Sequence, residues 1–266
     1  LRITANLEIS IKTARFIAVL LAVLCGASPA LAELSSYEAR YSIYRNGKLS
    51  GKAELSLAQE GDQWVIRSQG RGTHGLAKII GARDTEYTKG QLLDGRFQPE
   101  EYFRHTRAAT IDNRWLSTFN WPGDEVVIVH DGKKTYRLAL QGRALDPLAL
   151  KLDMRRRLME PDPDLSFLMV EEEEIEPQTF RTLEREWLET ALGCLETIPV
   201  EKVRDHDRRY TRAWHAPAYG NIEVRVEHGK TNGNHMEMRI TELEFDGMEV
   251  VAGPGCSARQ SAGAGF

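Results

Sequence analysis

The sequence lacks the compact motifs that identify most enzymes and metalloproteins. Its seven histidines are scattered, and none stands in an H-E-x-x-H or another close metal-ligand spacing. It contains neither a G-x-S-x-G nucleophile elbow nor a glycine-rich phosphate loop with its lysine. We therefore assign no catalytic residue, no metal ligand and no cofactor-binding residue, and we expect a non-enzymatic protein without a cofactor.

Long apolar runs are also missing, apart from a short one near the start. The apolar residues 16–24 are too few for a transmembrane helix, which needs about 20 residues. Three basic residues precede this run, and the small residues of Ala30-Leu31-Ala32 follow it. This order is typical of a secretory signal peptide. We expect residues 1–32 to be a signal peptide cleaved after Ala32, which leaves a periplasmic protein without a transmembrane segment.

Positive charge is not in excess either. Residues 33–266 contain 32 Lys and Arg against 38 Asp and Glu, a net charge of −6. Nucleic-acid-binding domains are usually basic, so this balance argues against a nucleic acid as partner. Residues 252–266 are rich in Gly, Ala and Ser and offer little for a core to bury. We expect them to form a disordered tail, and residues 33–251 to form a single β-rich domain.

Cysteine is scarce as well. Besides Cys25 in the predicted signal peptide, the chain has only Cys194 and Cys256. In an oxidising compartment these two could form an intramolecular disulfide. Two free thiols or an intermolecular bond are the alternatives that the sequence leaves open. Two cysteines in such different surroundings do not indicate a metal site.

What the sequence does contain is a regular alternation of apolar and polar residues, which is typical of β-strands. From Tyr37 to Leu57 the alternation continues across a turn. A three-residue loop, Arg45-Asn46-Gly47, keeps the apolar residues on one face and pairs Ile43 with Leu49. We therefore predict a hairpin with that loop and that register.

A second hairpin is predicted between residues 222 and 240. A three-residue loop, Thr231-Asn232-Gly233, sets Val226 opposite Met238. The same register places His228 and His235 on opposite faces of the sheet. We therefore expect no metal site shared between these two histidines.

Similar strand patterns recur along the rest of the chain, separated by short turns rich in Gly, Asn and Asp. They lie at residues 63–68, 84–88, 101–105, 111–120, 125–130, 135–140, 165–175, 180–188 and 197–204. Such a succession predicts a mainly β fold, a meandering antiparallel sheet curled into a roll or open barrel.

One segment breaks the β pattern and predicts an α-helix over residues 146–159. Asp146 stands where it can cap the helix, Pro147 where it can start it, and Pro161 where it can stop it. Leucines recur between them at helical spacing. We expect this helix to pack on the sheet or to plug one end of the roll.

Two charged clusters have both a structural and a functional interpretation. The acidic run Glu171–Glu174 indicates a charged edge strand, with a calcium site as the alternative. The basic group consists of Arg204, Arg208, Arg209 and Arg212. Acidic residues at positions 201, 205 and 207 lie among them, so we expect surface ion pairs. An anionic lipid headgroup or a glycan is the alternative partner.

The segment RAWHAPAYGNIEVRVE, residues 212–227, leads into a strand. Trp214 has the apolar area that anchors a strand to a core, and Pro217 holds the preceding residue extended. Gly220 supplies the turn before the strand. His215 points away from Trp214 in an extended chain, and we expect it to face solvent rather than to act in catalysis.

Five stretches follow one another along the chain: YEARYSIYRNGKLSGKAELSL, FQPEEY, DPLALKLDMRRRL, LGCLETIPVEKV and RAWHAPAYGNIEVRVE. In this order and spacing they resemble the bacterial exported family known as domain of unknown function 3108. The resemblance covers roughly residues 35–243 and implies a secreted, mostly β protein of the cell envelope. The family has no established activity, so the resemblance assigns no catalytic residue.

Three functions are compatible with an exported β protein of this kind. We expect a binding or carrier protein whose concave apolar face holds a lipid, an acyl chain or an envelope polymer. Its similarity to half-barrel lipoprotein carriers is one of fold alone. The alternatives are a structural or assembly factor that contacts another envelope protein, and a hydrolase whose carboxylates or histidines meet only after folding. An apolar cavity would favour the first, exposed sheet edges the second, and a cleft with shifted carboxylates the third.

Overall fold

The computed structural model describes residues 34–140 and 142–257, and these residues form one compact unit. The predicted signal peptide lies outside the described residues. Among the residues described, no helix is both long and apolar enough to cross a membrane. The unit consists of one 17-stranded sheet with helices α2 (Gly75–Ile79) and α3 (Pro147–Arg157) and the short 3-10 helix η1 (Pro217–Tyr219).

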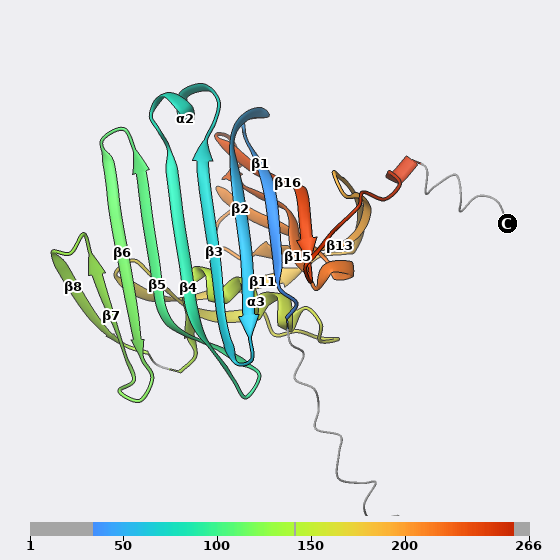
Figure 1. Cartoon of the computed structure of the whole chain (residues 1–266). Coiled ribbons are helices and arrows are strands. Elements are labelled where there is room, and N and C mark those ends of the chain that lie inside the picture. The colour runs from blue at the N-terminus through green and yellow to red at the C-terminus, as the bar shows by residue number, and fades with distance from the viewer. Residues whose placement is uncertain (1–33, 141, 258–266) are drawn as a thin grey trace, which may run out of the picture. The chain divides into compact units, whose positions relative to one another are not determined.

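The first eight strands form an antiparallel meander in chain order (Figure 1). They are β1 (Tyr37–Arg45), β2 (Lys48–Glu60), β3 (Gln63–Gly72), β4 (Arg83–Leu93), β5 (Arg96–Ala108), β6 (Ile111–Asn120), β7 (Glu125–His130) and β8 (Lys134–Ala139). β4 and β5 are about twice as long as the sequence pattern predicts. Their extra length carries Gly, Pro and charged residues, which conceal the alternation expected of a strand.

The remaining strands extend the same sheet beyond β1. They are β9 (Ala144–Leu145), β10 (Ser166–Glu171), β11 (Glu174–Thr182), β12 (Glu186–Thr190), β13 (Gly193–Lys202), β14 (Arg209–Ala216), β15 (Ile222–Lys230), β16 (His235–Phe245) and β17 (Met248–Glu249). β16 pairs with β1, and the order then runs through β15, β14, β13, β11 and β10 to β9. β8 and β9 do not pair with each other in the part of the chain described, so the sheet stays open. The predicted mainly β fold is confirmed.

The turn of the first hairpin is tighter than predicted. Pairing continues up to the residues on either side of Asn46-Gly47, and both turn residues have positive φ, 48° and 73°. A two-residue turn of this kind matches the twist of the strands that it joins. A β-bulge after Ile43 then shifts the register, so that Ile43 pairs with Gly51 and not with Leu49. The predicted loop and pairing are wrong because a bulge, like a longer loop, returns the apolar residues to one face. The second hairpin has the predicted register, with Val226 opposite Met238.

One face of the sheet, which we call the inner face, carries the hydrophobic core. On β1 the alternate residues Tyr37, Ala39 and Tyr41 are at most 6% exposed, as alternation requires. Helix α3 packs against this face, where it contacts β3, β4, β5 and β10. The helix begins where the sequence places it and ends at Arg157, two residues earlier than predicted.

Asp146 holds the start of α3 against the sheet. Its carboxylate accepts hydrogen bonds from the backbone N–H groups of Leu148 (2.9 Å) and Ala149 (3.1 Å). The buried hydroxyl of Thr88 on β4 donates a third, at 2.6 Å. Burial raises the pKa of Asp146 to about 6, although all three hydrogen bonds act in the opposite direction.

Residues 252–257 do not form the disordered tail that the sequence predicts but lie along the β12–β13 hairpin. The Gly253 N–H donates to the Leu192 carbonyl, and the Cys194 N–H donates to the Pro254 carbonyl, both at 3.0 Å. The structure places a disulfide between Cys194 and Cys256. The disulfide is one of the alternatives that the sequence leaves open, whereas the backbone hydrogen bonds that hold this segment cannot be read from its composition. Residues 258–266 lie outside the described part of the chain.

Candidate inner-groove binding site

The inner face is filled by α3 at one end of the strands and is hollow at the other end, next to α2. Figure 1 shows α2 at the tip of the β3–β4 connection and α3 lower down across the strands. In the filled part, Leu148 and Leu152 of α3 are at most 2% exposed. Toward α2 the inner positions of neighbouring strands are small, with Gly51 paired to Gly72 and Ala53 paired to Gly70. Small side chains and the absence of a covering helix leave space above this part of the sheet.

Glycine occupies positions 70 and 72 for different reasons. A Cβ atom on Gly72 would lie 2.3 Å from the Ala77 carbonyl oxygen, so glycine is needed for the close approach of α2. A Cβ atom on Gly70 would have no neighbour closer than 3.9 Å. Gly70 therefore contributes open space to the hollow and is not required by packing.

The first hollow, which we call the apolar hollow, has a volume of about 300 Å³. Ile43, Ala77, Ala82 and Ala108 supply its apolar wall. A volume of this size is at the lower end of the range for small-molecule sites, which are mostly apolar with a few polar groups.

A second hollow of about 450 Å³, the basic hollow, adjoins the first. The two share Ile43 and Ser50, so they form one continuous depression that we call the inner groove. Met236 keeps part of the basic hollow apolar, while Arg209 and Lys230 bring positive charge to its far side. The inner groove therefore becomes more polar toward the basic hollow, although Arg71, Arg83, Arg104 and Arg107 also border the apolar hollow.

The arginines in and near the basic hollow are only partly neutralised by carboxylates. Arg212 makes the expected ion pair, since it donates to Glu201 at 2.6 Å. Around Arg204, Arg208 and Arg209, however, no carboxylate oxygen of the described chain lies within 4.0 Å, so the predicted ion pairs are wrong for these three. The acidic neighbours in sequence point elsewhere, and the side chain of Asp205 is 95% exposed.

Mutual repulsion among these cations is visible in the pKa values of neighbouring groups. Burial and the guanidinium groups of Arg204 and Arg209 lower the pKa of His228. Burial, followed by the charge of Arg204, lowers the pKa of Lys202. Like charges held together in this way favour an anionic partner.

A carboxyl group with a raised pKa stands on the strand beside the apolar hollow. Burial, followed by the neighbouring carboxylate of Asp84, raises the pKa of Glu86 to about 7. The hydroxyl of Tyr102 donates to Glu86 at 3.1 Å, and Arg104 Nε lies 3.7 Å from its Oε1. Asp84 and Arg104 also line the apolar hollow. Sequence reasoning missed this group because the polar residues at 84 and 86 do not look like inward-facing positions.

The acidic run Glu171–Glu174 forms the two-residue turn of the β10–β11 hairpin and the strand residue on each side of it, and not the predicted edge strand. It joins β10 to β11, with Glu171 paired to Glu174 and Glu172 at a φ of 52°. The Glu171 carboxylate lies 3.7 Å from Arg104, which brings this turn next to the Glu86 group. Its first residue thus serves as an ion-pair partner for Arg104.

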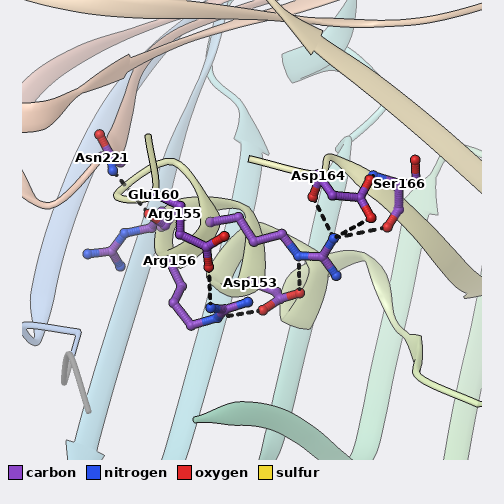
Figure 2. Close-up of polar contacts among 8 residues, drawn as sticks. Asp153, Arg155, Arg156, Glu160, Asp164, Ser166 and Asn221 are labelled. Atoms are coloured by element: carbon purple, nitrogen blue, oxygen red, sulfur yellow. Dashed lines mark hydrogen bonds and ion pairs between the residues drawn. The ribbon is translucent and has the colours of Figure 1, made fainter. Parts of the chain in front are cut away.

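The last turns of α3 carry three consecutive arginines with structural partners (Figure 2). Arg156 and Arg157 each donate to the carboxylate of Asp153, at 2.9 and 2.8 Å. Arg155 is 2% exposed, and its Nε donates to the carbonyl of Gly220 at 2.9 Å. Its guanidinium carbon lies 4.6 Å from the centre of the Tyr37 ring. These contacts join α3 to the turn before β15 and to β1.

The residues around Trp214 are buried on both faces of β14. Trp214 is 4% exposed and its indole N–H donates to Glu186, consistent with an anchor. His215 is 2% exposed, so the prediction that it faces solvent is wrong. A bulge follows Trp214, and His215 Nδ1 lies 2.9 Å from the carbonyl oxygen of Asn221. Burial lowers the pKa of His215 and favours the neutral imidazole.

The turn after this strand has the predicted composition. Pro217 starts η1, and Gly220 ends it in the left-handed region with a φ of 59°. Glu223 then pairs with Lys151 of α3 at 2.6 Å. Burial alone would raise the pKa of Glu223, but the ammonium of Lys151 and other nearby cations lower it. These residues fasten the helix to the sheet.

One trio has the composition of a metal site. Ligand atoms of Glu227, His235 and Glu237 lie within 4.8 Å of one another. Both carboxylates are already engaged, because Glu227 accepts from Arg225, and Glu237 accepts from Arg239 at 2.8 Å through both oxygens. The trio is therefore better explained as an ion-pair network than as a cation site.

The outer face of the sheet also has a hollow, of about 540 Å³. It is larger than either part of the inner groove, but its lining is mostly polar, and Arg40 pairs with carboxylates on neighbouring strands. Arg40 lies 2.7 Å from Glu242 and 3.5 Å from Glu54. We place the candidate site in the inner groove, because its apolar wall adjoins Arg209 and Lys230, which have no carboxylate oxygen within 4.0 Å among the described residues.

The fold and the groove define an open, single-sheet β protein with a helix on its inner face and a partly unfilled interior. The chain belongs to the family described as "Protein of unknown function (DUF3108)", whose profile matches residues 36–241. The resemblance seen in the sequence is confirmed.

The fold is similar to that of a solved structure at low sequence identity. A beta-barrel-like protein of domain of unknown function DUF1849 from Brucella abortus has a TM-score of 0.55 and 10% identity, over 80% of this chain and 98% of that chain. A "putative lipoprotein" from Parabacteroides distasonis has a TM-score of 0.34 and 11% identity, over 79% of this chain and 95% of that one. No curated protein matches the chain. The first similarity concerns the fold alone.

Proposed function

We propose that this protein is an exported, periplasmic binding or carrier protein that holds a single-chain amphiphile in the inner groove. The acyl chain occupies the apolar hollow, and an anionic head lies against the cations of the basic hollow. The observation that carries the proposal is the continuity of the two hollows through Ile43 and Ser50. The order of residues 1–32 and the Cys194–Cys256 disulfide support an oxidising compartment outside the cytoplasm.

The chemistry of the lining favours this class of ligand. Alanines and Ile43 in one part offer dispersion contacts to methylene groups but no hydrogen bonds. Arg209 and Lys230 in the other part offer charge-assisted hydrogen bonds to a carboxylate or phosphate. A wholly apolar ligand would leave the cations unused, and a wholly polar one would leave the apolar wall uncovered.

The test is a fluorescence titration of residues 34–266 with dansyl-undecanoic acid, an anionic acyl-chain probe. Gly70→Leu places a side chain in the apolar hollow without a backbone clash, so we expect probe affinity to fall at least about tenfold. Gln69→Leu is the matched control, because Gln69 is the preceding residue, is exposed and lines the outer hollow. Loss of binding in Gln69→Leu, with binding retained in Gly70→Leu, would assign the ligand to the outer face and refute the proposal.

The role of the cations is tested separately with Arg209→Gln/Lys230→Gln. We expect this variant to bind dansyl-undecanoic acid about tenfold more weakly and the uncharged amide of the same probe unchanged. Equal losses for acid and amide would mean that the two residues maintain the fold of the groove and do not recognise a charged head.

A hydrolase is the second candidate function, favoured by Glu86 alone. A carboxyl group with a pKa of about 7, beside a second carboxylate, can exchange a proton near neutral pH. Screening ester and glycoside substrates with the unaltered protein and with Glu86→Gln tests this function. Turnover that Glu86→Gln abolishes would support it, and turnover equal in both proteins would exclude Glu86 as its acid or base.

A further inference from the structure

The α2 end of the sheet exposes apolar side chains that no part of the described chain covers. On α2 itself, Leu76 is 68% exposed and Ile79 is 82% exposed. Ile111, the first residue of β6, is 50% exposed. Ile111 pairs with Ala108, and the next residue, Ala109, donates its N–H to the Ile80 carbonyl at 2.7 Å, so α2 lies beside the β5–β6 turn.

This apolar tip is held in place by the sheet. The backbone N–H groups of Thr73 and His74 both donate to the carbonyl of Ser50 on β2, at 2.9 and 3.1 Å. Together with the Ala109 bond, these contacts tie the loop to strands on both of its sides. Because the loop is anchored, it holds Leu76 and Ile79 exposed to solvent, which is unfavourable. Such an exposed apolar patch indicates a surface that is covered when the protein acts.

A row of cations lies directly below the tip on the outer face. Lys52, Arg71, Arg83 and Arg107 stand opposite one another in register across β2, β3, β4 and β5. Like charges in directly opposed positions destabilise a sheet. Within the described residues none of the four has a carboxylate oxygen within 4.0 Å. Lys78 adds a fifth positive charge on α2 itself.

We infer that the α2 end docks on an anionic lipid bilayer. Leu76 and Ile79 enter the boundary between headgroups and acyl chains, and the row of cations lies against the anionic headgroups. An apolar tip surrounded by basic residues matches both layers of such a surface. A protein partner would have to supply an acidic rim around an apolar pocket, whereas a bilayer offers this combination without a specific shape. Since Ala77 and Ala82 line the apolar hollow, docking would also bring the rim of the inner groove to the membrane.

The test is flotation of residues 34–266 with vesicles of pure phosphatidylcholine and with vesicles that also contain phosphatidylglycerol. We expect binding to the anionic vesicles at least about tenfold tighter, and weakened by high salt. Leu76→Ser/Ile79→Ser should reduce the partition coefficient about tenfold. Leu93→Ser/Met159→Ser is the matched control, because these residues are exposed (41% and 46%) outside the α2 region, and it should float like the unaltered protein.

Charge is tested in the same assay. Arg71→Gln/Arg83→Gln should weaken binding to anionic vesicles by about fivefold per cation removed. Arg96→Gln/Arg143→Gln, at two exposed arginines outside the row, should have no effect. Absence of binding to either vesicle, or equal losses in the test and control variants, would overturn the inference.

Two further measurements distinguish membrane docking from self-association and from ligand binding in the inner groove. If Leu76→Ser/Ile79→Ser converts a dimer to a monomer in analytical ultracentrifugation, the tip is covered by a second copy of the chain and the membrane is not its partner. Dansyl-undecanoic acid should bind Leu76→Ser/Ile79→Ser with unchanged affinity, because neither side chain lines the inner groove. Failure of membrane docking therefore leaves the proposed carrier function standing, and failure of probe binding leaves membrane docking standing.

Discussion

The α3 end and the α2 end of the inner face share the strands β2 to β5 but are completed differently. At the α3 end, Leu152 and Ile66 are fully buried, and Asp146 ties the helix to β4 through Thr88. At the α2 end the same strands carry Gly51, Gly70 and Glu86. The first end stabilises the protein, and the second leaves space for a ligand. Stability and the proposed ligand binding should therefore depend on different parts of the same strands, and changes in one part should leave the other intact.

Truncation in the filled end should have the largest effect on stability. Leu152→Ala removes a side chain with 0% exposure, and we expect it to lower the free energy of unfolding by about 3 kcal/mol. Urea denaturation measures this value. Leu76→Ala, at an exposed residue of α2, is the control and should stay within about 0.5 kcal/mol of the unaltered protein. If Leu152→Ala weakened dansyl-undecanoic acid binding in the folded protein, the division between the two ends would fail.

Ionisation of Glu86 should lower the free energy of unfolding as the pH rises. Its pKa is about 7 in the folded protein and near 4.5 in the unfolded chain, so folding favours the protonated carboxyl. Stability from this group is present below about pH 4.5 and is lost as the pH rises to 7. Glu86→Gln should therefore raise the free energy of unfolding by about 2 kcal/mol at pH 8 and leave it unchanged at pH 4.

A pH series of urea denaturation curves measures the Glu86 effect. Asp146, whose pKa is also raised, contributes in the same direction up to about pH 6 and remains in the variant. Glu244→Gln, at an exposed carboxyl of β16, is the control and should not change the difference between pH 8 and pH 4. A parallel pH dependence in Glu86→Gln and the unaltered protein would show that Glu86 is not desolvated in solution.

Replacement of a buried charge by an apolar side chain of similar size should have the smallest effect. Arg155 is buried in the filled end, and neither of its terminal nitrogens has a hydrogen-bond partner among the described residues. We expect Arg155→Met to change the free energy of unfolding by no more than about 1 kcal/mol. The variant loses the contacts of the guanidinium, but it also avoids the free-energy cost of removing that charge from water. Arg155→Ala, which leaves a cavity, should cost about 3 kcal/mol. A large loss in both variants would mean that the charge, and not the volume, joins α3 to β1.

Local patterns in the sequence predict the parts of this fold that depend on neighbouring residues. The cap and start of α3 follow from Asp146 and Pro147, and the β15–β16 register follows from the alternation around Thr231-Asn232-Gly233. The first hairpin could not be fixed in the same way, because a bulge and a longer loop both restore alternation. His215 was misplaced because burial on both faces depends on α3 and β12, which are distant in sequence.

Local sequence patterns could not predict the candidate site, for a related reason. The inner groove joins residues of β1 to β5, β14 to β16 and α2, which come from widely separated parts of the chain. The arginines near position 208 were visible, but their acidic neighbours in sequence suggested pairing that the side chains do not make. Composition gives the number of charges, and the fold determines which of them form ion pairs.

The position of β1 sets the order in which this molecule can be assembled. Tyr37 pairs with Leu57 on one side and with Phe245 on the other, so β1 is an interior strand whose second neighbour comes near the end of the chain. While the chain is being synthesised, the edge of β1 stays unpaired until β16 has followed. An unpaired edge is a template for association with other chains. A chaperone that shields the first strand would therefore act on this molecule longer than on one whose sheet grows strand by strand.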